Sequence, residues 1–152
     1  MSDERQVFLD AVLPVFVEAE RAMHDGDPGP RMTEWSRHDP VTLLGAGVRC
    51  RSGWDEIEPV QADVAARFAV CLEDEIELVA ADASGDLGYT VAIERYRARR
   101  PSGEEVVNEL RITHVYRREA SGWKMVHRHG DHLPEVDALY ARQGSTASEP
   151  RS

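Results

Sequence analysis

The sequence has little cysteine, and it has no long apolar run. Cys50 and Cys71 are its only cysteines. They lack the close pairing of a zinc site, so we expect two free, largely buried thiols. No apolar stretch approaches the roughly 20 residues that a membrane-spanning helix needs. The acidic N-terminus also lacks the layout of a secretory signal. These absences predict a cytoplasmic protein that does not enter a membrane.

Positive charge is also scarce. The chain carries 18 lysine and arginine residues against 28 aspartate and glutamate residues, for a formal net charge of −10. The basic residues are scattered, apart from Arg97, Arg99 and Arg100. Binding of a nucleic acid or of an anionic membrane surface depends on concentrated positive charge. We therefore expect neither partner.

What the sequence does contain is the composition of one globular domain. Hydrophobic residues make up 41% and charged residues 30% of the 152 residues. A single domain typically has roughly 100–150 residues and one core. We predict one domain over residues 1–143. The tail at 144–152 has no apolar residue larger than alanine and is expected to be disordered.

The first half of the chain predicts helices. Apolar residues recur at three- and four-residue steps over residues 4–24, which is typical of an amphipathic helix. Pro14 should kink this helix or mark a late start. Turn-forming residues at 25–30 end it. We expect a short helix at 32–36, a strand at 41–44 and a helix from Gly53 to about Phe68, distorted near Pro59.

The second half predicts strands. From Leu72 onward the apolar period changes to two, and short turns separate strands at 76–83, 88–99, 105–118 and 123–131. Residues 134–142 could form a closing helix. Consecutive hairpins make an antiparallel meander. The predicted fold class is α+β, a cone-shaped curved antiparallel sheet that N-terminal helices close around a cavity.

The hairpin at 105–131 carries most of the polar candidates, but alternation alone does not orient it. The last strand has one face with the bulky apolar groups, which we point inward: Trp123, Met125, His127, His129 and Asp131. On the strand before it both faces mix polar and apolar residues. Arg111 and Thr113 share one face, and His114 and Tyr116 share the other.

These features together resemble the SnoaL-like branch of the nuclear transport factor 2-like (NTF2-like) superfamily. The residues that carry the resemblance are Trp35, Arg51-Ser52-Gly53-Trp54, Gly85-Asp86, Thr113, Gly122-Trp123 and His127-Arg128-His129-Gly130-Asp131. The superfamily includes ketosteroid isomerase, polyketide cyclases, scytalone dehydratase and many proteins without demonstrated catalysis. The resemblance covers residues 7–133. It implies three helices and a curved sheet around a conical pocket, and a homodimer formed through the outer face of the sheet.

The resemblance also bears on chemistry. The catalytic aspartate of ketosteroid isomerase would fall on Leu43 or Leu44, its oxyanion-stabilising aspartic acid on Thr113, and its first-helix tyrosine near Ala19. All three positions have changed, which excludes steroid isomerisation by that mechanism. The same comparison turns Thr113 and its face of the strand into the pocket. A register slip of one residue would reverse this.

A general base is predicted at the end of the last strand. His129 and Asp131 lie on one face, about 6.5–7 Å apart between Cα atoms. The carboxylate can orient the imidazole and raise its basicity, while Arg111 across the strands can bind a carboxylate or enolate oxygen. We predict that all three are catalytic. The structural alternative is an Arg111–Asp131 ion pair beside a histidine bonded to backbone.

Six further residues are predicted to bind substrate: Trp35, Asp39, Trp54, Thr113, Val115 and His127. The tryptophans can equally be core anchors, and Asp39 can equally cap a turn. A straight strand would hold His127 and Asp131 about 13–14 Å apart, too far for one ion, so no metal is predicted. Glu94 and Tyr96 are expected to face a partner or solvent.

The predicted function is the binding of a small organic molecule without a cofactor. If the protein is an enzyme, proton-transfer chemistry on a carbonyl compound follows from the candidate base: isomerisation, cyclisation or dehydration. The alternative is a non-catalytic ligand-binding or assembly module of the same fold.

Overall fold

The computed structural model describes residues 3–45 and 47–132. The helices are α1 (Glu4–His24), α2 (Gly29–Glu34) and α3 (Trp54–Ala65). The strands are β1 (Thr42–Gly45), β2 (Val48–Ser52), β3 (Val70–Ser84), β4 (Leu87–Arg99), β5 (Glu105–Glu119) and β6 (Gly122–Asp131). The closing helix expected at 134–142 and the tail at 144–152 lie outside the described residues. None of the described helices is long and apolar enough to cross a membrane.

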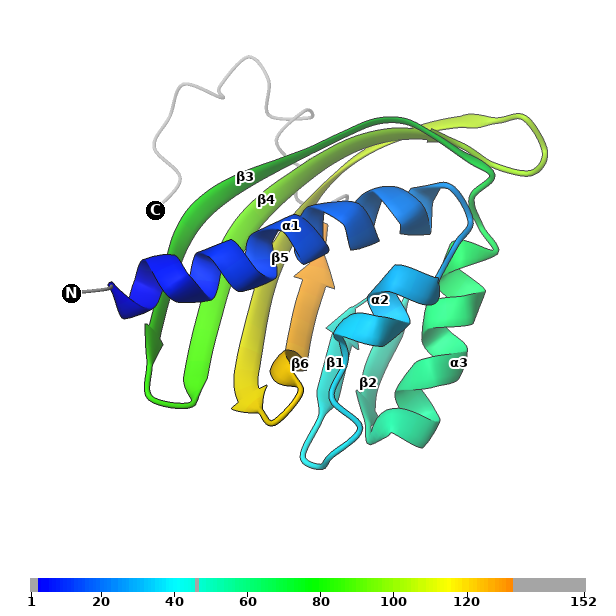
Figure 1. Cartoon of the computed structure of the whole chain (residues 1–152). Helices are drawn as coiled ribbons and strands as arrows, with labels where there is room; N and C mark the ends of the chain where they lie inside the picture. Colours follow the sequence, from blue (N-terminus) through cyan, green and yellow to red (C-terminus); the bar gives the residue numbers. More distant parts are fainter. Residues whose placement is uncertain (1–2, 46, 133–152) are drawn as a thin grey trace, which may run out of the picture.

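The six strands form one sheet in the order β2-β1-β6-β5-β4-β3. The four long strands are the predicted antiparallel meander, and β1 joins it by parallel pairing with β6. Figure 1 shows the long strands curving around α1, with α2 and α3 beside β1 and β2. The predicted α+β fold, a curved sheet with N-terminal helices, is confirmed. Strand β2 was not expected.

Helix α1 lies against the concave side of the sheet. Its start is fixed by Asp3, whose Oδ1 accepts a hydrogen bond of 2.9 Å from the backbone of Arg5. Phe8 and Phe16 of α1 are fully buried against the strands. Pro14 lies inside one continuous helix, so the late start is wrong. Since Pro14 is exposed, its missing N–H leaves no buried acceptor unpaired.

A β-bulge in β6 reverses the alternation of that strand. Val115 pairs with His127, but Tyr116 pairs with Met125, so Val126 is an extra residue. A bulge shifts every later side chain to the other face. Met125 is therefore buried on the concave side together with Arg128, whereas His127 turns to the outer face.

Candidate functional site

The concave side of the sheet contains a cavity of about 330 Å³. Residues of helices α1, α2 and α3 line it, together with the end of β1, the second half of β4, the first half of β5 and the end of β6. Its wall is unusually charged for a protein interior, because Glu20, His24 and Arg128 all line it while being at least 93% buried. Groups of this kind stay buried only when they are paired. Their pairing defines the candidate site.

A network of four buried charges closes one wall of the cavity. Glu20 of α1 accepts hydrogen bonds from Arg31 of α2 and, at 2.6 Å, from Nη1 of Arg128 of β6. Arg31 in turn donates through Nε to Oε1 of Glu34 at 2.7 Å. All four side chains are at most 9% exposed. The network ties α1 and α2 to the sheet.

The two carboxyl groups of this network differ in protonation. Burial favours the neutral form of Glu20, but Arg128 and Arg31 together hold its pKa well below the usual range. Glu34 shares Arg31 with Glu20, and burial raises the pKa of Glu34 to about 7. Its second oxygen, Oε2, is buried without a partner among the described residues. Glu20 is therefore the ionised carboxyl group of the network, whereas Glu34 titrates near neutral pH.

Arg128 continues the network into the sheet. Its Nη1 also lies 2.8 Å from Nε2 of His114, whose Nδ1 lies 2.9 Å from the hydroxyl of Tyr116. A guanidinium can only donate, so Nε2 of His114 accepts and Nδ1 carries the proton. Burial, and next the charge of Arg128, hold the pKa of His114 well below its usual range. His114 is therefore a neutral member of the network that lies behind Arg128.

A second group lies at the end of α1. Nδ1 of His24 lies 2.8 Å from Oδ2 of Asp74 on β3, and both side chains are at most 4% exposed. Tyr96 stacks on the imidazole ring at 3.8 Å, and Phe68 contacts it edge-on. Among the described residues, Nε2 of His24 has no partner. Asp74 thus fixes the ring and the tautomer, and the other nitrogen is left free to accept a proton.

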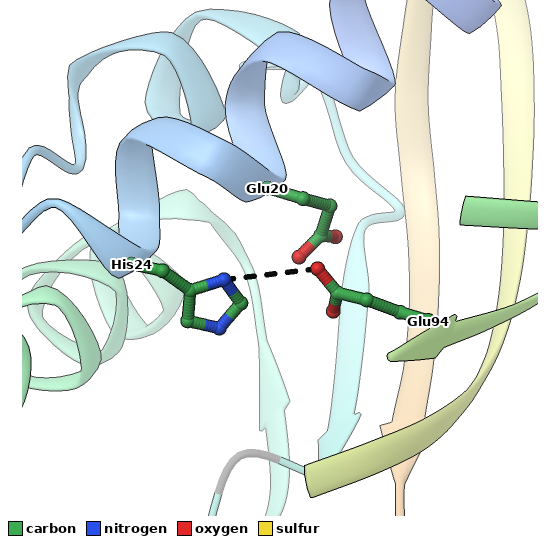
Figure 2. A group of neighbouring side chains, drawn as sticks. All are labelled: Glu20, His24 and Glu94. Carbon is green, nitrogen blue, oxygen red and sulfur yellow. Dashed lines mark ion pairs between the residues drawn. The ribbon is translucent and has the colours of Figure 1, made fainter. Parts of the chain in front are cut away.

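Glu94 of β4 lies behind this histidine. Figure 2 shows its carboxyl group directed at Nδ1 of His24, 3.7 Å away, with Glu20 nearby on α1. Glu94 is fully buried, and neither of its oxygens has a hydrogen-bond partner among the described residues. Burial, together with the charges of Glu20 and Asp74, raises its pKa well above the usual range. This environment favours the neutral, protonated form of Glu94.

The same residues are the metal-ligand candidates of the described chain. Glu20, His24 and Glu94 offer ligand atoms that all lie within 4.8 Å of one another. However, two arginines already neutralise Glu20 and would repel a cation, and Asp74 engages Nδ1 of His24. The pairing favours proton-transfer chemistry over a metal centre.

The residues predicted to be catalytic lie on the outer face of the sheet. Arg111 is 53% exposed and His129 47% exposed. The expectation that they look inward is wrong, because β5 buries the opposite set and the bulge at Val126 turns the end of β6. The structure does bring them together: Arg111 donates to Asp131 at 2.9 Å, and His129 lies 3.2 Å from Asp131. Asp131 also borders the cavity. Their catalytic role stays a prediction.

The predicted substrate-binding residues are dispersed. Thr113, Val115 and His127 share the outer face, and His127 bonds to the hydroxyl of Thr42 at 2.7 Å. Trp35 is fully buried in the core. None of the six is among the described residues that line the cavity.

The other two predicted substrate-binding residues are Trp54 and Asp39. Trp54 is half-buried beneath the guanidinium of Arg37, which lies 3.6 Å from its ring. Asp39 is exposed. Cys50 is exposed as well, and Cys71 is half-buried, so burial of both thiols is also wrong.

Sequence reasoning missed the interior site, although α1 held a signal. Phe8, Val12, Phe16, Glu20 and His24 follow one another at four-residue steps, so they share one line of the helix. All five are buried. Glu20 and His24 follow the three apolar residues at the same spacing, and this pattern predicts that both titratable side chains are buried. Glu94 and Tyr96, expected at the surface, are inside because β4 turns its even-numbered residues toward α1.

Comparisons with known proteins agree with this architecture. The family model of the SnoaL-like domain matches residues 15–131. No curated protein matches the chain. A candidate dehydratase of the NTF2-like family from Streptomyces avermitilis superposes with a TM-score of 0.68 at 20% identity, over 86% of this chain and 99% of that one.

Two further solved structures show the same fold. A ketosteroid isomerase-like protein from Erwinia carotovora atroseptica has a TM-score of 0.69 at 16% identity, over 88% of this chain and 98% of its own. The association domain of CaMKII from C. elegans has a TM-score of 0.61 at 13% identity, over 85% and 98%. At such low identity the likeness concerns the fold alone.

Proposed function

Because the chain belongs to the SnoaL-like domain family, we propose that it uses the interior cavity to catalyse a cofactor-independent proton transfer on a small carbonyl compound. The observation that carries this proposal is that His24, which lines the cavity, forms a buried pair with Asp74. An imidazole oriented by a carboxylate is a general base. The reaction class is isomerisation, cyclisation or dehydration.

The proposed chemistry begins with the free nitrogen of His24. Nε2 accepts a proton from the carbon next to the carbonyl group, and the electron pair of the broken C–H bond moves to the carbonyl oxygen as an enolate. Asp74 stabilises the imidazolium that forms. Returning the proton to another carbon gives an isomer, whereas loss of a β-hydroxyl group as water gives the dehydrated product.

Glu94 supports the same chemistry from behind the ring. If Glu94 were ionised, His24 would sit between two carboxylates and hold its proton too tightly to return it. The raised pKa of Glu94 favours its neutral form, while Asp74 stays paired with the imidazole. The low polarity of the buried site strengthens each of these interactions.

Deuterium exchange tests the proposal without knowledge of the natural substrate. The protein is incubated in D₂O with a panel of small ketones such as cyclohexanone and 2-tetralone, and NMR follows the loss of protons next to the carbonyl group. We expect protein-dependent exchange, which His24→Asn lowers by about 10²–10⁴-fold, as for the loss of a general base. Asp74→Asn should lower it less, because the base remains but loses its orientation.

The matched control is His129→Asn on the outer face. It makes the same substitution at the histidine that the sequence favoured as a base, so it also tests the predicted outer trio of Arg111, His129 and Asp131. Exchange should survive in this variant. If His129→Asn abolishes exchange and a folded His24→Asn does not, the base lies outside and our assignment is wrong. Circular dichroism shows whether each variant is folded.

A second candidate function is assembly, favoured by the association domain among the similar structures. We propose a homodimer through the outer face of the sheet, where Tyr89 is 42% exposed and pairs with Val115 across β4 and β5. Light scattering should show a dimer at micromolar concentration, and Tyr89→Arg should give a monomer because it replaces an exposed aromatic ring of that face by a charge. A monomeric wild-type protein would exclude this interface.

A further inference from the structure

The described lining of the cavity holds more arginines than acidic residues, although the protein is strongly acidic. Among the described residues, four arginines line it, Arg31, Arg67, Arg100 and Arg128, against the two acidic residues Glu20 and Asp131. Arg31 and Arg100 also pair with Glu34 and Glu104, which do not line the cavity. The chain as a whole carries a net charge of −10. A cleft whose wall has the opposite sign to the rest of the surface concentrates ligands of one charge. Here it favours an anion.

Arg128 has donors that the protein does not use. Its Nη1 serves both Glu20 and His114. Its Nε and Nη2 have no acceptor among the described residues, although the side chain is only 9% exposed. A buried guanidinium with two adjacent unused N–H groups presents the fork that matches the two oxygens of a carboxylate.

Gly130 leaves this side of Arg128 uncovered. A Cβ atom at residue 130 would lie 3.1 Å from Nη2 and 3.3 Å from both Cζ and Nε of Arg128. Both residues line the cavity. Any side chain at residue 130 would therefore cover the unused donors, whereas glycine leaves room for a ligand atom.

We propose that the cavity binds its ligand through a carboxylate group held by Nε and Nη2 of Arg128. This rests on the proposed function and narrows its substrate class to small organic acids that also carry a carbonyl group. A singly charged group suits the site, because Glu20 already neutralises part of the charge of Arg128. A dianionic phosphate would be more costly to bury beside Glu20.

Paired ligands test the proposal on the wild-type protein. Binding of benzoate and phenylacetate is compared with that of benzamide and phenylacetamide by calorimetry. These pairs match in shape and differ in charge. We expect each carboxylate to bind at least tenfold more tightly than its amide, because charge-assisted hydrogen bonds are stronger than neutral ones. Equal affinities, no binding of carboxylates at millimolar concentration, or tighter binding of phenyl phosphate would each overturn the proposal.

Two variants locate the binding. Gly130→Ala covers the free side of Arg128 but keeps its contacts with Glu20 and His114, so we expect at least a tenfold loss of benzoate affinity and little change for benzamide. The control Arg118→Gln removes an exposed arginine that pairs with Asp86 and does not line the cavity. It should lower benzoate affinity less than threefold. If Gly130→Ala leaves benzoate binding unchanged, Arg128 is not the anchor.

The exchange assay with neutral ketones keeps the two proposals apart. Cyclohexanone has no carboxylate, so its exchange depends on His24 and not on the free donors of Arg128. If the protein exchanges ketone protons but binds carboxylates no more tightly than amides, only the proposed role of Arg128 is overturned. Tight carboxylate binding in a protein that exchanges no proton would overturn the catalytic role alone.

Discussion

Replacement of Glu20 by glutamine is expected to lower the free energy of unfolding by about 3–5 kcal/mol, which is typical when one partner of a buried ion pair is removed. Glu20 is the only group between Arg31 and Arg128 in the buried network as described, and it accepts hydrogen bonds from both. A neutral amide leaves Arg128 without a carboxylate and Arg31 with Glu34 alone. Urea unfolding followed by circular dichroism measures the loss.

Two further variants test whether charge is the cause. Glu18→Gln makes the same change at an exposed position of α1 and should cost at most about 0.5 kcal/mol. Adding Arg128→Met to Glu20→Gln removes the uncompensated charge, so the double variant should be more stable than Glu20→Gln alone. If Glu18→Gln and Glu20→Gln cost the same, the network does not stabilise the fold.

The part of the fold that depends on hydrophobic period was predictable. The apolar residues of α1 recur with the period of a helix, and those of the meander alternate as in strands, because each element buries one face. Both patterns can be recognised in the sequence. Strand β2 was not predictable in this way. Its residues Val48–Ser52 are mostly polar, and the strand lies at the edge of the sheet. An edge strand has a neighbouring strand on one side only, and here its apolar residues are too few for an alternation that would predict it.

The orientation of the site was not predictable, and the reason is local. Val126 interrupts the alternation of β6, yet neither glycine nor proline marks the bulge. Without the bulge, His127 and His129 would join Met125 on the concave side. With it, Arg128 takes that place. The extra residue therefore places an arginine on the concave side of the sheet, and it places the histidine–aspartate pair on the outer face.

Buried charge is the second feature that sequence rules miss. Glutamate and arginine are assigned to the surface because an isolated buried charge is costly. Here the cost is shared in the network of Glu20, Arg31, Glu34 and Arg128. The partners come from α1, α2 and β6, so only the folded chain shows that each charge has its complement.

The pH dependence of stability gives the last prediction, and it concerns Glu34. Burial raises its pKa in the folded state to about 7, whereas an unfolded glutamate titrates near 4.3. The folded state therefore holds this proton more tightly. The resulting stabilisation is complete below about pH 4.3, and it is lost as the pH rises through about 7.

Glutamine mimics the protonated side chain, so Glu34→Gln should become more stable relative to wild type as the pH rises from 5 to 8. The expected gain is a few kcal/mol, since one pKa unit corresponds to about 1.4 kcal/mol. His114 acts in the opposite direction, because its lowered pKa costs stability as the pH falls below about 6.5. Comparing the two proteins at each pH cancels that contribution, which both share.

Urea unfolding at several pH values measures the difference, and Glu58→Gln at an exposed position of α3 is the matched control. A difference between wild type and Glu34→Gln that stays constant from pH 5 to 8 would show that Glu34 is ionised throughout. The single positive charge of Arg31 would then be shared between two ionised carboxylates, those of Glu20 and Glu34. Arg128 would have to neutralise the part of the negative charge of Glu20 that Arg31 leaves. The charge left on Arg128 for a ligand would be smaller. The titration of Glu34 therefore tests the electrostatic basis of the anion site as well as the stability of the network.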